Sequence, residues 1–214
     1  MKTDGLISML ATGPIAVDPS TTTRRIGAAA AVGLAIAAVV MLAALGLRAD
    51  LASAVSMPMF WMKFVVPLCL AIAFYIASTR LARPGGRAKG ACISAAAVLA
   101  MLWTAAGIDL ATAPAGQRSS MVEGTSATMC VLSIALLSLP TLVAMFAALR
   151  GLAPTRLMAA GMVAGGLAGA AAALVYAVHC NEMALPFLAV WYVLGMFVPA
   201  ALGAAAGPRF LRWV

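Results

Sequence analysis

The chain has 214 residues, of which 64% are hydrophobic and only 9% are charged, and its mean hydropathy is +1.07. A soluble domain carries about 25% charged residues, so this composition excludes a globular protein with a water-facing surface. The formal net charge is +8, but the basic residues lie between hydrophobic runs, which favours a role in membrane topology over one in nucleic-acid binding.

Residues 1–25 form the longest polar segment. They are not a signal peptide, because the apolar run begins only after Arg25 and is long enough to span a membrane. Thr3 or Asp4 can cap a short helix, and its apolar residues then share one face at spacings of three to four: Leu6, Ile7 and Leu10. A helix of two turns is marginal alone, so this tail is either a frayed terminus or a segment that folds on a partner.

Six hydrophobic runs follow, and each approaches or exceeds the ~20 residues that cross a bilayer as a helix. Strands are unlikely because the runs are continuous and do not alternate. The sequence therefore predicts an all-α polytopic membrane protein with six transmembrane helices: Ile26–Leu47, Phe60–Thr79, Ala88–Gly107, Thr125–Leu149, Thr155–Val178 and Phe187–Ala206.

The basic residues are divided unequally between the two sides of such a bundle. Arg48 and Arg118 lie in the loops on one side, and Lys63 lies near the start of the second helix, from which it can snorkel to the interface. The tail, the 80–90 and 150–156 loops and the C-terminus hold all the others: Lys2, Arg24, Arg25, Arg80, Arg83, Arg87, Lys89, Arg150, Arg156, Arg209 and Arg212. This bias predicts that both termini are cytoplasmic and that loops 48–59, 108–124 and 179–186 face outward.

Two patterns concern helix packing. Gly161, Gly165 and Gly169 repeat every four residues on the fifth run, a spacing that lets helix backbones approach closely; we expect packing within the bundle rather than a dimer contact. Prolines inside the second, fourth and sixth runs are expected to bend those helices: Pro67, Pro140 and Pro199.

The four cysteines differ in expected depth. Cys69 and Cys92 are most simply small apolar core residues. Cys130 lies about one turn below the outer end of the fourth helix, and Cys180 lies at the outer end of the fifth, directly after His179, the only histidine. Two cysteines from different helices are thus expected on the outer side at similar depth.

Three interpretations of this cluster remain open. The cysteines can be inert and packed. They can form a dithiol–disulfide pair, because the outer compartment permits disulfides, with His179 lowering the pKa of Cys180. Cys130, Cys180 and His179 can also form a soft-metal site.

Enzyme signatures are absent from the sequence. It contains no C-x-x-C, no G-x-S-x-G, no H-E-x-x-H and no phosphate loop. We therefore expect neither an enzyme nor a bound cofactor. A proton-coupled transporter would normally show buried ionisable residues, which lowers the expectation of a transport role.

Several short motifs, in their order along six helices, give the whole chain a resemblance to the NrsF family of bacterial inner-membrane anti-sigma factors. They are Lys2-Thr3-Asp4 with Leu6-Ile7, Gly46-x-Arg48-x-Asp50-Leu51, Phe60-Trp61-x-Lys63, Arg83-Pro84-Gly85, Ser126 with Cys130, His179-Cys180, Trp191-Tyr192-x-x-Gly195 and Arg212-Trp213.

The resemblance implies a function and a division of the chain. Residues 1–25 would be a cytoplasmic sigma-binding tail, residues 26–207 a six-helix transmembrane sensor domain, and residues 208–214 a short cytoplasmic C-terminal tail. The tail would hold an extracytoplasmic-function sigma factor at the inner membrane through Lys2, Thr3, Asp4, Leu6, Ile7 and Leu10. Cys130 and Cys180, with His179 beside them, would sense metal or oxidative stress and release it.

The expected partners are therefore a sigma factor and the lipid bilayer, with no direct contact to nucleic acid. The alternative from another class is a small multi-pass transporter or a membrane thiol redox carrier. That alternative requires a substrate path or a second thiol pair, and the sequence shows neither.

Overall fold

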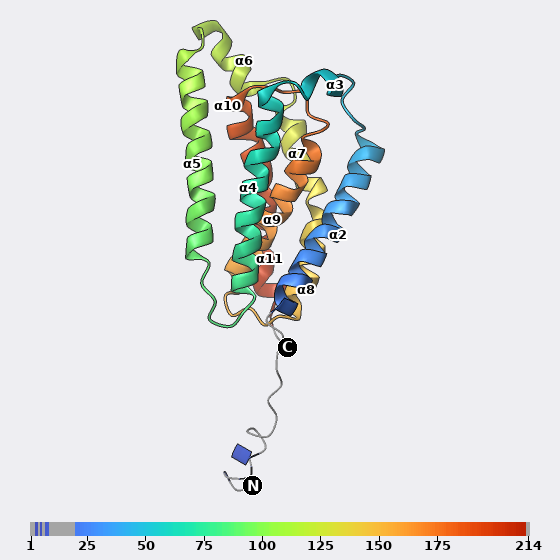
Figure 1. Ribbon diagram of the computed structural model, residues 1–214, viewed down its shortest axis with the longest axis vertical. Helices are drawn as coiled ribbons and strands as arrows, with labels where there is room; N and C mark the ends of the chain where they lie inside the picture. Colours follow the sequence, from blue (N-terminus) through green and yellow to red (C-terminus); the bar gives the residue numbers. More distant parts are fainter. Residues whose placement is uncertain (1–2, 4, 6, 9–19, 213–214) are drawn as a thin grey trace.

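The computed structural model describes Thr3, Gly5, Ile7, Ser8 and residues 20–212 of the chain. Its helices run roughly side by side as one bundle (Figure 1). Their bounds are α2 (Ser20–Ala44), α3 (Leu51–Ala54), α4 (Pro58–Leu81), α5 (Lys89–Thr112), α6 (Arg118–Glu123), α7 (Ala127–Leu137), α8 (Leu139–Arg150), α9 (Leu157–Tyr176), α10 (Leu185–Phe187) and α11 (Val193–Phe210), with single turns η1 (Ala115–Gln117) and η2 (Leu188–Tyr192).

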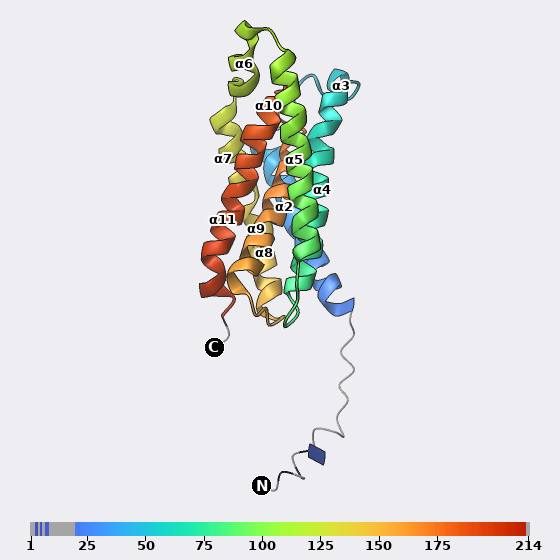
Figure 2. The same cartoon turned by 90° about the vertical axis from the view of Figure 1, so that its left-hand side faces the viewer.

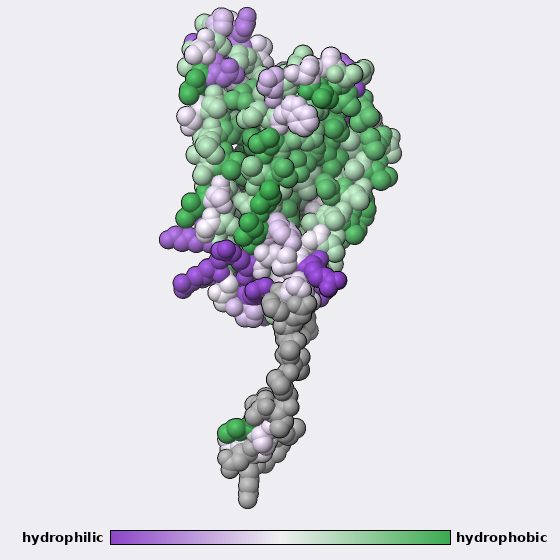
Figure 3. Space-filling view, in the orientation of Figure 1, coloured by the Kyte–Doolittle hydropathy of each residue, from purple (hydrophilic) through white to green (hydrophobic). Residues whose placement is uncertain are grey.

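Six helical stretches are long and apolar enough to cross a membrane, which confirms the predicted fold class. The fourth stretch, Ala115–Arg150, comprises η1 and α6 to α8, and the sixth comprises α10, η2 and α11. Large apolar side chains such as Val39, Met101 and Val143 are exposed on the outside of the bundle. Figure 3 shows a hydrophobic band around the middle of the bundle, with the strongly hydrophilic residues at its two ends.

The helix α9 lies at the centre of the bundle. Fifteen of its twenty residues are buried, and it packs against α11, α4, α8, α2 and α7. A Cβ atom on Gly161 or Gly165 would overlap the backbone carbonyl oxygen of Gly203 or Pro199 on α11. The glycine repeat therefore serves packing inside the bundle, as predicted, because only glycine lets the two backbones come this close.

The fourth span is not the single helix that the sequence predicts. It divides at Ser138 into α7 and α8, with Pro140 in the first turn of α8. Proline has no N–H to donate and its ring excludes the preceding turn's carbonyl, so the regular helix stops there. Pro67 and Pro199, by contrast, lie inside α4 and α11, which continue past them.

Both ends of the described bundle lie on the same side. The start of α2 and the end of α11 are adjacent to the loops 82–88 and 151–156 in both views (Figures 1 and 2). We call this side the termini end. The opposite side, formed by loops 45–57, 113–126 and 177–184, we call the thiol end. An even number of spans requires this arrangement.

The sigma-binding residues proposed from the sequence are only partly described. Thr3 and Ile7 are helical and exposed, and Ser8 Oγ donates to the Gly5 carbonyl at 3.0 Å, as in a helical turn. Lys2, Asp4, Leu6 and Leu10 lie outside the described residues. The proposed apolar face of the tail therefore stays a prediction.

The charge asymmetry predicts the side of each loop. Reporter fusions after Arg25, at Gly86 and at the C-terminus should show cytoplasmic activity, and fusions at Gly116 and Asn181 should show periplasmic activity. The measurement is paired phosphatase and fluorescent-protein reporters at each site. An inverted pattern would place the thiol end in the cytoplasm and contradict every outward-facing assignment made for it.

Candidate functional site

The two cysteines that the sequence places on one side meet inside the thiol end. Cys130 lies in the first turn of α7, and Cys180 follows the last turn of α9. Both are free thiols with 0% and 2% of their surfaces exposed. The two thiols lie close enough for the Cys130 thiol to interact with the Cys180 sulfur.

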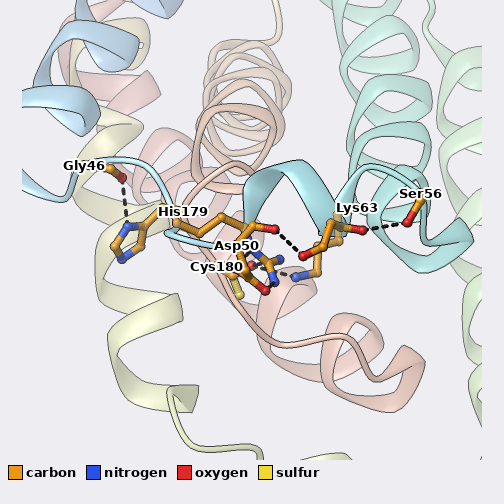
Figure 4. A network of polar contacts seen from close by, with 8 residues as sticks. Gly46, Asp50, Ser56, Lys63, His179 and Cys180 are labelled. Atoms are coloured by element: carbon orange, nitrogen blue, oxygen red, sulfur yellow. Dashed lines mark hydrogen bonds and ion pairs between the residues drawn. The ribbon is translucent and has the colours of Figure 1, made fainter.

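Two cations converge on the backbone beside this pair. Lys63 Nζ donates to the Cys180 carbonyl oxygen at 2.9 Å, and Arg48 Nη1 donates to the same oxygen at 3.1 Å. Arg48 is itself fixed by Asp50, whose two carboxylate oxygens accept its Nε and Nη2 at 2.7 Å each. Figure 4 shows Asp50 and Lys63 close to Cys180. The end of α9 is therefore clamped by two charge-assisted hydrogen bonds.

Lys63 does not snorkel to the interface, which corrects the expectation from the sequence. It is 1% exposed, because it lies on the face of α4 that packs into the bundle and finds a carbonyl acceptor there. In the described part of the chain no carboxylate lies within ion-pair distance of it. A buried, unpaired ammonium favours any negative charge that forms nearby.

The negative charge closest at hand is the Cys180 thiolate. The pKa of Cys180 lies below its ordinary value, chiefly because the Cys130 thiol hydrogen-bonds to the sulfur, with the charge of Lys63 acting in the same direction and burial opposing both. The Tyr192 hydroxyl is also buried against this sulfur and has no other partner among the described residues. A thiolate formed at Cys180 is thus stabilised by its surroundings.

His179 is directed away from the Cys180 sulfur. Its Nδ1 donates to the Gly46 carbonyl at 3.0 Å, and its ring lies against Tyr176, on the far side of the network from Lys63 (Figure 4). Lys63, and not His179, supplies the positive charge beside Cys180. No cluster of three or more His, Cys, Asp or Glu side chains is poised for a metal ion within the described ranges.

Glu182 joins the loop after α9 to the start of α7. Its Oε1 accepts from the Thr125 amide and hydroxyl at 2.7 Å each and from the Ser126 hydroxyl at 3.2 Å. Burial raises the pKa of Glu182, but these bonds outweigh burial and hold it below the ordinary value. The carboxylate satisfies N–H groups at a helix N-terminus, so Cys130 and Cys180 are fixed relative to each other on both sides.

The segment carrying Cys180 is also bonded to the end of α2. Gly46, just after the end of α2, has φ +72°. Its carbonyl accepts a hydrogen bond from His179 Nδ1, and the Arg48 amide donates to the Val178 carbonyl at 3.4 Å. With the Arg48–Cys180 bond, every residue from 178 to 180 has a hydrogen bond to the loop after α2. The segment 178–180 is therefore hydrogen-bonded to the loop that follows α2, the helix that leads to the N-terminal tail.

Cys69 and Cys92 are not core residues, contrary to the expectation from the sequence. Both are exposed on the outside of the bundle. Depth along a helix does not determine which face a residue occupies, and a thiol is apolar enough to lie against lipid. Neither contributes to the buried pair.

The sequence singled out Cys130, Cys180 and His179 but not the two cations. The sequence does contain a signal for Arg48 and Lys63. They are two of only three basic residues on the side opposite to the other eleven, and a cation in that position needs a structural reason. Their positions in the motifs Gly46-x-Arg48-x-Asp50 and Phe60-Trp61-x-Lys63 give the same indication.

Comparison with known proteins supports the family resemblance along the whole chain. The profile of a family described as "NrsF: Negative regulator of sigma F" matches residues 10–213. The chain is 41% identical over 213 residues to the "Probable anti-sigma-F factor NrsF" of Azospira oryzae and 36% identical over 214 residues to the "Anti-sigma-F factor NrsF" of Caulobacter vibrioides, with 100% of both chains covered in each case. No solved structure matches.

Replacing Lys63 by methionine should make Cys180 less reactive. The change removes the positive charge and leaves an unbranched side chain, so the pKa of Cys180 should rise and its alkylation should need a higher pH. The measurement is the rate of iodoacetamide modification of Cys180 against pH, followed by mass spectrometry in a Cys69→Ser/Cys92→Ser background. Lys89→Met, at the termini end, is the matched control. An unchanged pH profile in Lys63→Met would show that Lys63 only caps α9.

Proposed function

We propose, from the premise that this chain belongs to the NrsF family of negative regulators of sigma F, that it holds an extracytoplasmic-function sigma factor at the bacterial inner membrane and releases it when Cys130 and Cys180 react. Members of this family are regulators and not catalysts, and the chain is an anti-sigma factor with six membrane-spanning helices. The observation that supports the sensing step is the contact between the buried thiols of Cys130 and Cys180. The Cys180 carbonyl also accepts a hydrogen bond from Arg48, which lies in the loop after α2.

The proposed division of labour follows the chain. Residues 1–25 bind the sigma factor in the cytoplasm, residues 26–207 form the transmembrane sensor, and residues 208–214 are a short cytoplasmic tail. The charge asymmetry supports this orientation, because eleven of the fourteen Lys and Arg residues belong to the tail and the termini end. Neither the sensor nor the tail needs contact with nucleic acid.

Two reactions are open to the thiol pair. With a two-electron oxidant such as a peroxide, the Cys180 thiolate attacks oxygen to give a sulfenic acid and release the reduced leaving group, and the Cys130 thiol then displaces water to form a disulfide. With a soft metal ion, the two sulfurs lose their protons and ligate it together. A disulfide fixes the two sulfurs at about 2.05 Å, and a metal ion bound by both sulfurs also fixes their separation. Both reactions therefore change the distance between the start of α7 and the end of α9.

The route to the tail runs through α2. Movement of residues 178–180 alters their bonds to Gly46 and Arg48, and α2, 25 residues long, extends from there to the termini end as a rod of about 37 Å. Along its length α2 packs on α8 and α9, so a rotation or shift at one end is carried to the other.

The energy available at the clamp matches what such a switch needs. Converting a partner from almost fully bound to almost fully free requires about 5.5 kcal/mol of differential affinity. Buried hydrogen bonds to charged groups contribute roughly 1.5–3 kcal/mol each, and the Cys180 carbonyl accepts two of them. Loss of this clamp on oxidation or metal binding is of the required order.

The tail is tested by charge insertion into its apolar face. Leu6→Asp with Leu10→Asp should raise sigma-dependent transcription without stress, because buried anchors of an interface contribute about 2 kcal/mol each, or roughly thirtyfold in affinity per residue. The measurement is a transcriptional reporter together with capture of the sigma factor by the full-length protein. Ile15→Asp with Val17→Asp, beyond Gly13-Pro14 in the same tail, is the control for charge and length.

Unchanged repression by the Leu6/Leu10 variant, at a normal membrane level, would contradict the tail assignment. The binding surface would then have to lie on the 82–88 and 151–156 loops.

The sensor is tested by removing each thiol separately. Cys130→Ser and Cys180→Ser should each abolish the response to stress or lock it on, and the double variant should behave like either single variant, because the two sulfurs act as one unit. Cys69→Ser and Cys92→Ser are the matched controls and should respond normally. His179→Ala should shift the sensitivity without removing the response, since its imidazole only holds the loop.

Arg48→Gln separates sensing from transmission. The thiol pair should still react in this variant, seen as a disulfide or a metal adduct by mass spectrometry, while release of the sigma factor is reduced. A normal stress response in the Cys130→Ser/Cys180→Ser variant would refute the thiol mechanism, and normal release in Arg48→Gln would refute the route through α2.

A further inference from the structure

The termini end carries a hollow that the proposed function does not use. It lies where α4 ends and α5 and α9 begin, has a volume of about 400 Å³ and is lined by Arg87, Lys89 and Arg156 together with apolar residues of the same helices. The three cations are exposed and make no ion pair with any residue in the described ranges. Since every acidic residue between positions 20 and 212 lies toward the thiol end, this positive charge has no acidic partner in that described part of the chain.

A second feature lies deeper on the same three helices and is closed on its other side by α11. About two turns further into the bundle on α4 and α5, a narrow slot of about 40 Å³ is walled by apolar side chains, among them Phe74 of α4, Leu99 of α5 and the face of α9 at Gly166. A Cβ on Gly166 would lie 2.9 Å from the Phe74 ring, so any larger residue would close the slot. The basic hollow and the apolar slot are therefore stacked along the membrane normal.

The two features lie along the same three helices, and their linings are only one or two turns apart on each: Leu81 and Phe74 on α4, Cys92 and Leu99 on α5, Val163 and Gly166 on α9. α5 packs mainly on α4 and, near the thiol end, on α10, so its lower half stands away from α9 and α11 (Figure 2). The hollow lies at the depth of helix ends, where lipid headgroups reside, and the slot lies in the hydrocarbon region. The amides of the first turns of α5 and α9 border the hollow and add partial positive charge.

We propose that this groove binds one anionic phospholipid, with the phosphate between Arg87, Lys89 and Arg156 and an acyl chain against the slot. A free phosphate ion fits the charges but gains nothing from the apolar slot. A zwitterionic lipid fits the slot but does not neutralise the net positive charge of the three cations. Basic pockets between transmembrane helices at the headgroup level are suited to anionic lipids for this reason.

The test uses the full-length protein in a non-ionic detergent. Phosphatidylglycerol should be retained in native mass spectrometry and should raise the melting temperature, whereas phosphatidylcholine with the same acyl chains should do neither. In the triple variant Arg87→Gln/Lys89→Gln/Arg156→Gln, phosphatidylglycerol should bind at least about tenfold more weakly. Arg24→Gln/Arg80→Gln/Arg209→Gln is the control: it removes the same charge at the same end without touching the hollow, and should bind normally.

Two further measurements test the site without depending on that variant. Cys92 lines the hollow and is exposed, so phosphatidylglycerol should slow its alkylation in the unmutated protein and phosphatidylcholine should not. Leu99→Trp, which fills the slot, should weaken retention, while Met101→Trp on the exposed side of α5 should not.

Three outcomes would overturn the proposal. Equal loss of phosphatidylglycerol in the two triple variants would reduce the effect to general surface charge. Stabilisation by inorganic phosphate alone, equal to that by the lipid, would indicate a free-anion site. Unchanged retention in Leu99→Trp would show that the slot holds no acyl chain.

Discussion

The backbone carbonyl of Cys180 is the atom on which the thiol end depends. It lies just beyond the last turn of α9, where the partial negative charge of the helix accumulates, and it accepts both Lys63 and Arg48. A buried ammonium without a partner would be too costly in an apolar bundle, so the position of α4 and of the loop after α2 is set by the need to reach this oxygen. The same arrangement places a positive charge beside the Cys180 sulfur, so the groups that stabilise the fold also activate the thiol.

The packing of α9 determines where the bundle can move. Its glycines bring α11 into backbone contact, and interfaces packed this closely are bistable or rigid and do not deform continuously. The opposite side of the thiol pair is different, because α7 is short and ends at Ser138, one helix break from α8. If Cys130 and Cys180 react as proposed, we therefore expect α7 and the loop beyond α9 to move more easily than α9 itself. That loop is the one hydrogen-bonded to the residues just after α2.

The sequence predicts the membrane class, the six spans and the common side of Cys130 and Cys180, because run length and charge asymmetry are properties of whole segments. It does not predict which face of a helix a residue occupies in a bundle whose helices are apolar all round, and Cys69 and Cys92 are misplaced for that reason. The direction of His179 also could not be read from its adjacency to Cys180, since the chain is leaving a helix there. Lys63 was assigned to the interface because its acceptor, a carbonyl 117 positions away, exists only in the folded bundle.

The basic residues fall into two classes with different physical roles. At the termini end the basic residues between positions 24 and 212 are exposed, and their charge faces water, lipid headgroups or a partner, although Arg25 also donates to the Ala147 carbonyl of α8. At the thiol end there are three, and each donates to carbonyls at a helix C-terminus: Lys63 and Arg48 to Cys180 after α9, and Arg118 to Ala111 and Ala113 at the end of α5. Cations at that position are stabilised by the helix dipole and by the unpaired carbonyls. The exceptions to the charge asymmetry therefore do not oppose the topology, because their charge is neutralised locally by carbonyls at helix ends. Where two of these cations lie beside a thiol, they can neutralise a thiolate in the same way.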